Sequence, residues 1–232
     1  MATYALVLSG CGKNDGSEIQ EAVSILIHLS RLGIDAQCFA PDAPQTDVIN
    51  HATGKPGPGG QTRNMLVEAA RIARGAIAPL SQLDPASADA LLFAGGFGAA
   101  KSLCNFAAPG DKGGPNCEVL PDVERVIKGF HAAKKPIGLC CIAPVLAARV
   151  LGTRKGGAGV KVTIGNDTAT AEAIQTMGAT HVPKGVTEAF TDDRQRVVTT
   201  PAYMYDATPA EVFEGIGRMV EGVQKLTEVR TW

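Results

Sequence analysis

Apolar runs and amphipathic stretches alternate along the 232 residues of the chain. Short, continuous apolar runs that end at glycine or proline are typical of strands buried on both faces. Longer stretches with apolar residues every three or four positions are typical of helices. The expected strands are residues 3–9, 35–40, 88–94 and 136–140, with shorter ones near 160–164, 180–183 and 196–199. The expected helices are residues 17–32, 62–73, 119–133, 142–151, 168–177 and 209–227.

Strand and helix segments alternate from one end of the chain to the other, which predicts a mostly parallel sheet with helices on both faces. Residues 54–60 and 105–118 are rich in glycine, proline and polar residues, and both are predicted to be loops. No repeat, charge block or long linker divides the chain. We therefore predict an α/β fold with a single domain over residues 1–232.

The junction at Cys141 is the first place where chemistry is expected. The strand 136–140 passes almost directly into the helix 142–151, and this is the shape of a nucleophile elbow. A cysteine at a helix N-terminus is expected to have a lowered pKa. The backbone N–H of Ile142 is expected to point toward the same space as the sulfur. Cys140 belongs to the strand and is predicted to be a small core residue.

Two further strand ends are candidates, because ligands of open α/β sheets bind beyond the carboxyl ends of the strands. The Gly95-Gly96 step can expose backbone N–H groups that stabilise an oxyanion, or it can be an ordinary tight turn. Glu18 lies in the first turn of the helix 17–32. It is either a proton acceptor at the sheet edge or a charge favoured by the helix dipole. Residues 197–203 either line the same edge or simply end a strand.

Two nucleotide-binding motifs are incomplete in this sequence. Gly10 and Gly12 begin a G-x-G-x-x-G pattern, but Asp15 stands where the third glycine is required. Lys101 and Ser102 end a P-loop-like segment in which Ala100 replaces the required glycine. The sequence therefore predicts no nucleotide cofactor.

Composition narrows the possible partners and the expected location. With 22 basic and 23 acidic residues, the chain lacks the positive balance typical of nucleic-acid binders. It also lacks a polybasic segment and an apolar run long enough to cross a membrane. The six cysteines and four histidines are too irregularly spaced for a disulfide scaffold or a metal site. The N-terminus does not read as a secretory signal, so we expect a cytoplasmic protein.

Several blocks of the sequence, taken in order, resemble the ElbB-like proteins. These are isoprenoid biosynthesis glyoxalases of the class I glutamine amidotransferase-like group, within the PfpI superfamily. The resemblance spans nearly the whole chain. The blocks are residues 10–12 (GCG), 15–19 (DGSEI), 38–42 (CFAPD), 47–51 (DVINH), 62–64 (TRN), 95–101 (GGFGAAK), 141–144 (CIAP) and 198–204 (VTTPAYM).

This resemblance implies a flavodoxin-like, three-layer α/β/α sandwich with Cys141 as nucleophile and Glu18 beside it. It implies an oxyanion site formed by the N–H groups of Gly96 and Ile142. It also implies a homodimer that converts methylglyoxal or glyoxal to a hydroxy acid without glutathione, metal or another cofactor.

One departure from the wider superfamily concerns histidine. Many relatives have a histidine directly after the elbow cysteine or in a later loop, whereas Ile142 follows Cys141 here. We assign no function to His181, the nearest histidine in the later sequence. This departure counts against a protease or amidase. Alternatives to a glyoxalase are a hydrolase or deglycase of glycated or acylated small molecules, and a non-catalytic cysteine redox sensor. A dinucleotide-binding protein is a more distant alternative.

Overall fold

A seven-stranded sheet forms the centre of the computed structural model, which describes residues 2–229. The strand order is β10-β11-β7-β6-β1-β2-β5, and every pair is parallel except β10 with β11. This confirms the predicted α/β class with a mostly parallel sheet. The strands are β1 (Thr3–Val7), β2 (Asp35–Ala40), β5 (Ile77–Pro79), β6 (Ala90–Phe93), β7 (Ile137–Cys140), β10 (Phe190–Asp192) and β11 (Val197–Thr200).

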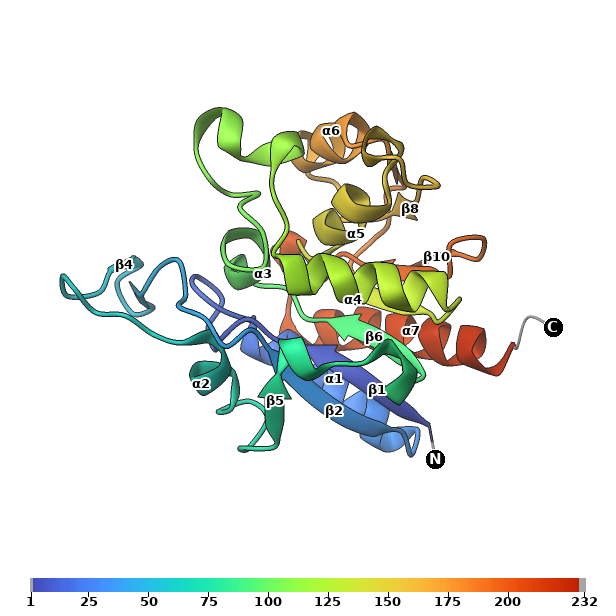
Figure 1. Ribbon diagram of the computed structural model, residues 1–232, viewed down its shortest axis with the longest axis horizontal. Helices are drawn as coiled ribbons and strands as arrows, with labels where there is room; N and C mark the ends of the chain where they lie inside the picture. Colours follow the sequence, from blue (N-terminus) through green and yellow to red (C-terminus); the bar gives the residue numbers. More distant parts are fainter. Residues whose placement is uncertain (1, 230–232) are drawn as a thin grey trace.

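Helices cover both faces of this sheet, giving three layers (Figure 1). Helices α1 and α7 pack together on one face, and α4 and α5 share the core of the other face. The α-helices are α1 (Ile19–Arg31), α2 (Met65–Ala69), α3 (Phe97–Lys101), α4 (Pro121–Ala132), α5 (Pro144–Leu151), α6 (Thr168–Thr176) and α7 (Pro209–Glu228). Short 3-10 turns are η1 (Leu80–Gln82), η2 (Pro85–Ser87), η3 (Gly110–Lys112), η4 (Gly114–Asn116), η5 (Thr153–Lys155) and η6 (Ala202–Met204).

The first strand shows why the apolar runs are continuous. Successive side chains of a strand point to opposite faces. Tyr4 and Leu6 accordingly pack into the core beneath α1 and α7, while Ala5 and Val7 pack into the core beneath α4 and α5. All four are fully buried. A sheet covered on both faces therefore selects apolar residues at every position rather than at alternate ones.

The long predicted helix over residues 62–73 is only partly correct. Helix α2 begins after the side chain of Asn64 accepts a hydrogen bond from the Val67 N–H, and it ends at Ala69. Beyond it the N–H of Ile72 bonds to the carbonyl of Ala69, an i→i−3 bond that tightens the chain into turns. These turns bury Ile72 and Ala73 in the core that also contains residues of β2 and β5. The apolar spacing that suggested a helix is therefore met by a helix followed by turns.

Several short elements also differ from the prediction. The segments near 160–164 and 180–183 shorten to β8 (Lys161–Val162) and β9 (Thr180–His181), which pair with each other outside the central sheet. The small hairpin β3 (Ile49–Asn50) and β4 (Lys55–Pro56), the edge strands β5 and β10, and helix α3 were not predicted. Each is five residues or shorter, too short to show a periodic pattern.

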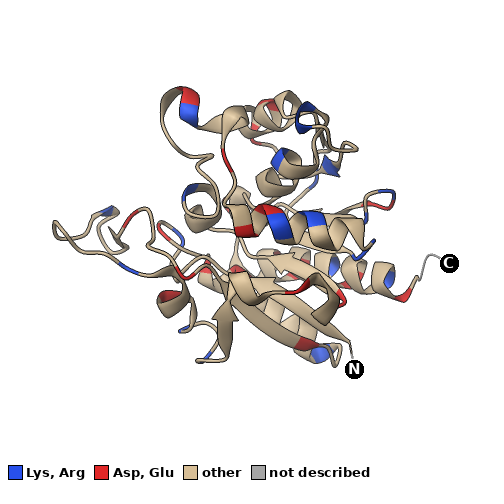
Figure 2. Cartoon of the chain, in the orientation of Figure 1, with Lys and Arg blue, Asp and Glu red and all other residues tan. Residues whose placement is uncertain are grey.

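Acidic and basic positions are both spread over the chain in Figure 2, and along α4 the acidic residues come before the basic ones. Two of its pairs are ion pairs, Asp122 with Arg125 at 3.1 Å and Glu124 with Lys128 at 2.6 Å. Within residues 2–229, no helix combines the length and the apolar character needed to cross a bilayer.

The core beneath α4 and α5 is expected to supply much of the stability. Phe130 on α4 is fully buried, and Phe130→Ala is expected to lower the free energy of unfolding by about 3–5 kcal/mol through lost burial and a residual cavity. Val67 is 63% exposed, so Val67→Ala is expected to change the free energy of unfolding by less than about 0.5 kcal/mol. Urea unfolding of both variants measures the difference, and equal losses would contradict this assignment of the core.

Candidate active site

The site forms where β7 turns into α5. Cys141 has a φ of 59°, in the left-handed region that non-glycine residues rarely occupy. Its N–H bonds to the carbonyl of Thr200 at 3.0 Å, which ties the turn to the adjacent strand β11. Pro144 is the first residue of α5, where its missing N–H costs nothing. These features give the strand-to-helix corner the geometry of a nucleophile elbow.

Backbone N–H groups surround the sulfur of Cys141. The N–H groups of Gly96 and Ile142 lie near it and act to lower its pKa. Gly96 has a φ of 89°, and a Cβ at this position would lie 2.4 Å from the backbone nitrogen of Glu18. Glycine is therefore required for the turn to bring its N–H to the cysteine. The two donors predicted from the sequence lie together at the sulfur.

A buried carboxyl group that the sequence analysis did not select lies beside the cysteine. Glu21 on α1 is fully buried, and its Oε2 accepts a 3.0 Å hydrogen bond from the N–H of Gly95. The thiol of Cys140 donates to the same oxygen at 3.6 Å, and the thiol of Cys141 lies beside the carboxyl and acts to lower its pKa. Its other oxygen accepts from the N–H of Tyr203 at 3.3 Å. Glu21 therefore joins α1, the Gly-Gly turn, the elbow and the start of η6.

The close packing at Gly95 makes this contact possible. A Cβ at Gly95 would lie 2.4 Å from the Cβ of Cys141 and 2.5 Å from Oε2 of Glu21. Real Cβ contacts are not this short, so any side chain at Gly95 would push the cysteine and the carboxyl apart. Gly95 is thus a packing requirement of the site, whereas Gly96 supplies a hydrogen-bond donor.

Burial controls the protonation of the Glu21 carboxyl and the Cys141 thiol. Burial, the largest cause, and the nearby charge of Glu18 together raise the pKa of Glu21 to about 7, while hydrogen bonds oppose the rise. Burial, followed by the negative charge of Glu21, also raises the pKa of Cys141 well above its ordinary value. The expected lowering of this pKa is therefore wrong, because desolvation outweighs the two N–H donors. Each shift favours the neutral form of its group.

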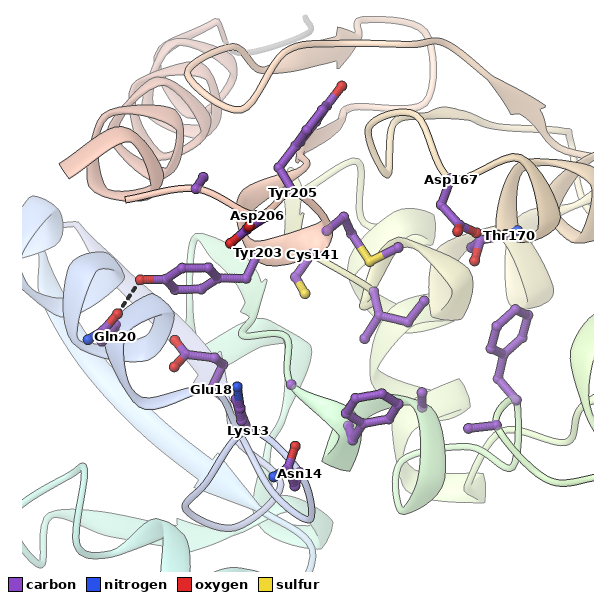
Figure 3. Close-up of a pocket in the computed structure, with 18 residues that line it drawn as sticks. Lys13, Asn14, Glu18, Gln20, Cys141, Asp167, Thr170, Tyr203, Tyr205 and Asp206 are labelled. Atoms are coloured by element: carbon purple, nitrogen blue, oxygen red, sulfur yellow. Dashed lines mark hydrogen bonds between the residues drawn. The ribbon is translucent and has the colours of Figure 1, made fainter. Parts of the chain in front are cut away.

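Glu18 lies at the entrance of the site rather than against the sulfur. It is the N-cap of α1, and its Oε2 accepts a 2.7 Å hydrogen bond from the N–H of Glu21. Within residues 2–229 no hydrogen bond joins it to Cys141. Partial burial raises the pKa of Glu18, and the carboxyl faces the pocket above the cysteine (Figure 3). The cap shows the helix-terminus role of Glu18, and its role as a proton acceptor stays a prediction.

The position of Glu21 did carry a signal in the sequence. Residues three and four positions apart share one face of a helix. Glu21 lies three residues before Ser24 and four before Ile25, both of which are buried. An acidic residue on the buried face of an amphipathic helix is unusual, because a buried charge requires a partner. This helical position, rather than closeness to the glycine-rich turn, identifies the carboxyl nearest the elbow.

A pocket of about 880 Å³ opens above Cys141 (Figure 3). Lys13, Glu18 and Gln20 lie on the side formed by α1 and the preceding loop, and Tyr203 extends its hydroxyl toward Gln20. Asp167 and Thr170, at the start of α6, lie across the pocket. None of the four histidines in the described part of the chain lines this pocket, so it holds no Cys-His pair.

The glycine-rich loop before α1 is folded against itself and against α3. The N–H groups of Gly12 and Gly16 bond to carbonyls of the same loop, and the N–H of Gly98 bonds to the carbonyl of Gly16 at 2.9 Å. These amides are therefore not free to bind phosphate. Across residues 2–229 no three His, Cys, Asp or Glu side chains are grouped as metal ligands would be.

Comparisons with known proteins identify the family. No family model matches the chain. It is 52% identical to the rat "ES1 protein homolog, mitochondrial" and to the human "Glutamine amidotransferase-like class 1 domain-containing protein 3, mitochondrial". Each alignment covers 97% of this chain and 84% of the relative. An Ehrlichia chaffeensis crystal structure, described as an isoprenoid biosynthesis protein with an amidotransferase-like domain, matches with a TM-score of 0.87. Its identity is 35%, over 96% of this chain and 99% of that one.

These relatives show that the chain belongs to the class I glutamine amidotransferase-like family. Glyoxalase III from Candida albicans matches the fold with a TM-score of 0.60 at 14% identity, over 99% of this chain and 98% of that one. The flavodoxin-like architecture implied by the sequence is thereby confirmed. The expected cytoplasmic location is contradicted, because the curated relatives are named as mitochondrial proteins. Free cysteines indicate reducing conditions, which do not specify one compartment.

The buried carboxyl makes the stability of the protein depend on pH. The pKa of Glu21 rises from its ordinary 4.5 to about 7 on folding. Its contribution is therefore fully present below pH 4.5 and is lost as the pH rises through about 7. The difference corresponds to about 3 kcal/mol. Glu21→Gln is expected to reduce the loss of unfolding free energy between about pH 5 and about pH 9 by that amount.

Urea unfolding at the two pH values measures this difference, and the comparison uses the change with pH rather than the absolute stability. The amide leaves one of the N–H donors of Gly95 and Tyr203 without an acceptor, so the variant is less stable at low pH. An unchanged pH dependence in Glu21→Gln would show that Glu21 folds with an ordinary pKa.

Proposed function

We propose that this protein is an ElbB-like, cofactor-independent glyoxalase, which converts methylglyoxal or glyoxal to the hydroxy acid without glutathione. One observation carries the proposal. The Cys141 thiol lies on a strained elbow at the base of a pocket, between a buried carboxyl and two backbone N–H donors. This arrangement provides a nucleophile, a proton acceptor and an oxyanion site within one small volume.

In the first step the sulfur of Cys141 attacks the aldehyde carbon and forms a hemithioacetal. Glu21, whose pKa is about 7, accepts the thiol proton as the C–S bond forms. The raised thiol pKa is then no obstacle, because the acceptor is already in contact and a free thiolate is not required. The N–H groups of Gly96 and Ile142 stabilise the negative oxygen that develops on the former aldehyde carbon.

In the second step a proton moves from the former aldehyde carbon to the neighbouring ketone carbon through an enediol, and the ketone oxygen takes the proton that Glu21 removed from the thiol. Glu18 faces the pocket and has a raised pKa, so it is suited to carry this proton. The aldehyde carbon is thereby oxidised to a thioester and the ketone carbon is reduced to an alcohol. Water cleaves the thioester, releases the hydroxy acid and returns the proton to the thiol. The sum is methylglyoxal plus water to lactate, with no external oxidant.

Turnover of methylglyoxal by the purified protein without glutathione tests the proposal, with lactate as the measured product. Cys141→Ser is expected to abolish turnover, and Glu21→Gln to lower it at least about 100-fold because the acceptor of the thiol proton is lost. Glu18→Gln is expected to lower kcat at least about 100-fold and to leave KM nearly unchanged. Full activity in Cys141→Ser would rule the mechanism out.

Two other activities are separated by the same assay. A hydrolase or deglycase using Cys141 would release the parent amine or acid from a glycated or acylated substrate and would form no lactate from methylglyoxal. A non-catalytic redox sensor would oxidise at Cys141 under mild peroxide and turn over neither substrate. The raised pKa of Cys141 disfavours the sensor, because the thiolate is the species that oxidises readily.

We also propose that the chain forms a homodimer through α1. Three apolar side chains, Ile19, Val23 and Ile27, are spaced four residues apart on one helix face, and each is 38–44% exposed. An apolar stripe on an outer helix is typical of a surface that another molecule covers. A second copy of the chain can present the same stripe across a two-fold axis.

The solution mass tests the dimer. The wild-type protein is expected to elute at twice its chain mass of 24.0 kDa in light scattering coupled to size exclusion. Val23→Arg places a charge at the centre of the stripe and is expected to give the monomer mass. Val67→Arg, at an exposed apolar position on α2, serves as the control and is expected to remain dimeric. A monomeric wild-type protein would contradict the proposal.

A further inference from the structure

The pocket above Cys141 has an apolar wall that a three-carbon substrate does not use. It consists of Phe97 and Ala100 from α3, Phe106 and Ala107 from the loop after α3, Ile142 from the elbow and Met204 from η6. We call these six residues the apolar wall. Phe106, Ile142 and Met204 are partly buried and pack against the core, so much of the wall is rigid.

Phe97 is the unusual member of the apolar wall. It directly follows the donor Gly96, yet 51% of it is exposed to solvent. Its N–H donates to the carbonyl of Lys13 at 2.7 Å, which fixes the backbone. The Lys101 ammonium lies 5.1 Å from the ring centroid and also pairs with Asp47 at 2.6 Å. The ring is therefore held in place by its neighbours without being buried by them.

The side of the pocket formed by α1 and the preceding loop is polar. Lys13, Glu18 and Gln20 lie there (Figure 3), close to where the mechanism needs a proton carrier. The acidic Asp167 borders the apolar wall, but its carboxylate accepts a 2.8 Å hydrogen bond from the N–H of Thr170 as the cap of α6. A substrate of matching polarity places its oxygens toward α1 and an apolar body against the apolar wall.

We propose that the preferred substrates are 1,2-dicarbonyls that carry an aromatic group on the ketone carbon. This inference rests on the proposed glyoxalase function and adds its substrate class. Methylglyoxal occupies only a small part of a pocket of about 880 Å³ and leaves the exposed ring of Phe97 uncovered. An aromatic group buries that ring and gains the favourable geometry of an aromatic pair.

The chemistry balances as it does for methylglyoxal. Phenylglyoxal plus water gives mandelate. Cys141 adds to the aldehyde carbon, which is oxidised to the thioester, and the carbon bearing the ring is reduced to the alcohol. One proton moves between the two carbons, and water releases the acid and restores the thiol. The reaction needs no further reactant.

The experiment compares kcat/KM for phenylglyoxal and methylglyoxal at equal pH, with mandelate and lactate measured directly. The wild-type protein is expected to favour phenylglyoxal at least about tenfold. Phe97→Ala is expected to lower kcat/KM for phenylglyoxal about tenfold and for methylglyoxal less than about twofold. Phe97→Tyr retains the ring and is expected to restore the preference. Val67→Ala, which removes another exposed apolar side chain outside the pocket, is expected to change neither value.

The outcomes separate this inference from the function on which it rests. If methylglyoxal is converted and phenylglyoxal is not preferred, or if Phe97→Ala affects both equally, the aromatic subsite is wrong and the glyoxalase proposal stands. If neither compound is converted, the glyoxalase proposal fails. In that case equilibrium dialysis with mandelate decides about the subsite. Binding that weakens in Phe97→Ala and not in Val67→Ala supports it, and equal or absent binding overturns it.

Discussion

The organisation of the site depends on one buried contact, between the Glu21 carboxyl and the Cys141 thiol. A carboxyl without solvent must be neutral or fully hydrogen-bonded. Here the N–H groups of Gly95 and Tyr203 and the thiol of Cys140 meet that requirement, with the Cys141 thiol beside them. These partners come from the ends of β6, β7 and β11, so three parallel strands must finish at one level for the contact to exist. The sheet order places β6, β7 and β11 side by side, and α1 brings in the carboxyl from above their ends.

The same contact explains a thiol that is protected in the resting protein. Burial and the adjacent carboxyl favour the neutral sulfur, while the N–H groups of Gly96 and Ile142 favour the thiolate. The groups that stabilise an anion are thus present before the anion is, which is the usual meaning of preorganisation. A cysteine with a permanently low pKa would instead react with many electrophiles and oxidants. The protein combines a reactive geometry with a restrained ground state.

Much of the fold could be predicted because its main strands and helices are long and strongly patterned. The apolar run at residues 3–9 and the spacing along residues 17–32 each specify one element. The elbow was also visible, since few local structures place a cysteine between a buried strand and an immediate helix. The glutamate that contacts the sulfur was not identified, because that contact depends on how α1 is rotated against the sheet. The pKa of Cys141 was misjudged for a related reason. The helix terminus is a local feature of the sequence, whereas desolvation arises from the whole fold.

The site combines backbone groups, which most substitutions leave in place, with pocket side chains, which substitutions change directly. The two anion-stabilising donors are backbone N–H groups, and Gly95 cannot accept a side chain without displacing the cysteine. Among substitutions, only a change to proline removes a backbone N–H, so the geometry of the site is set largely by the backbone. The apolar wall, by contrast, is carried largely by a five-residue helix and a surface loop. On the proposed function, chains that share this scaffold can therefore exchange one substrate for another by altering a few side chains of the apolar wall, while the reaction type stays the same. Specificity on this fold would then evolve through the side chains that line the pocket, while the backbone around the cysteine is retained.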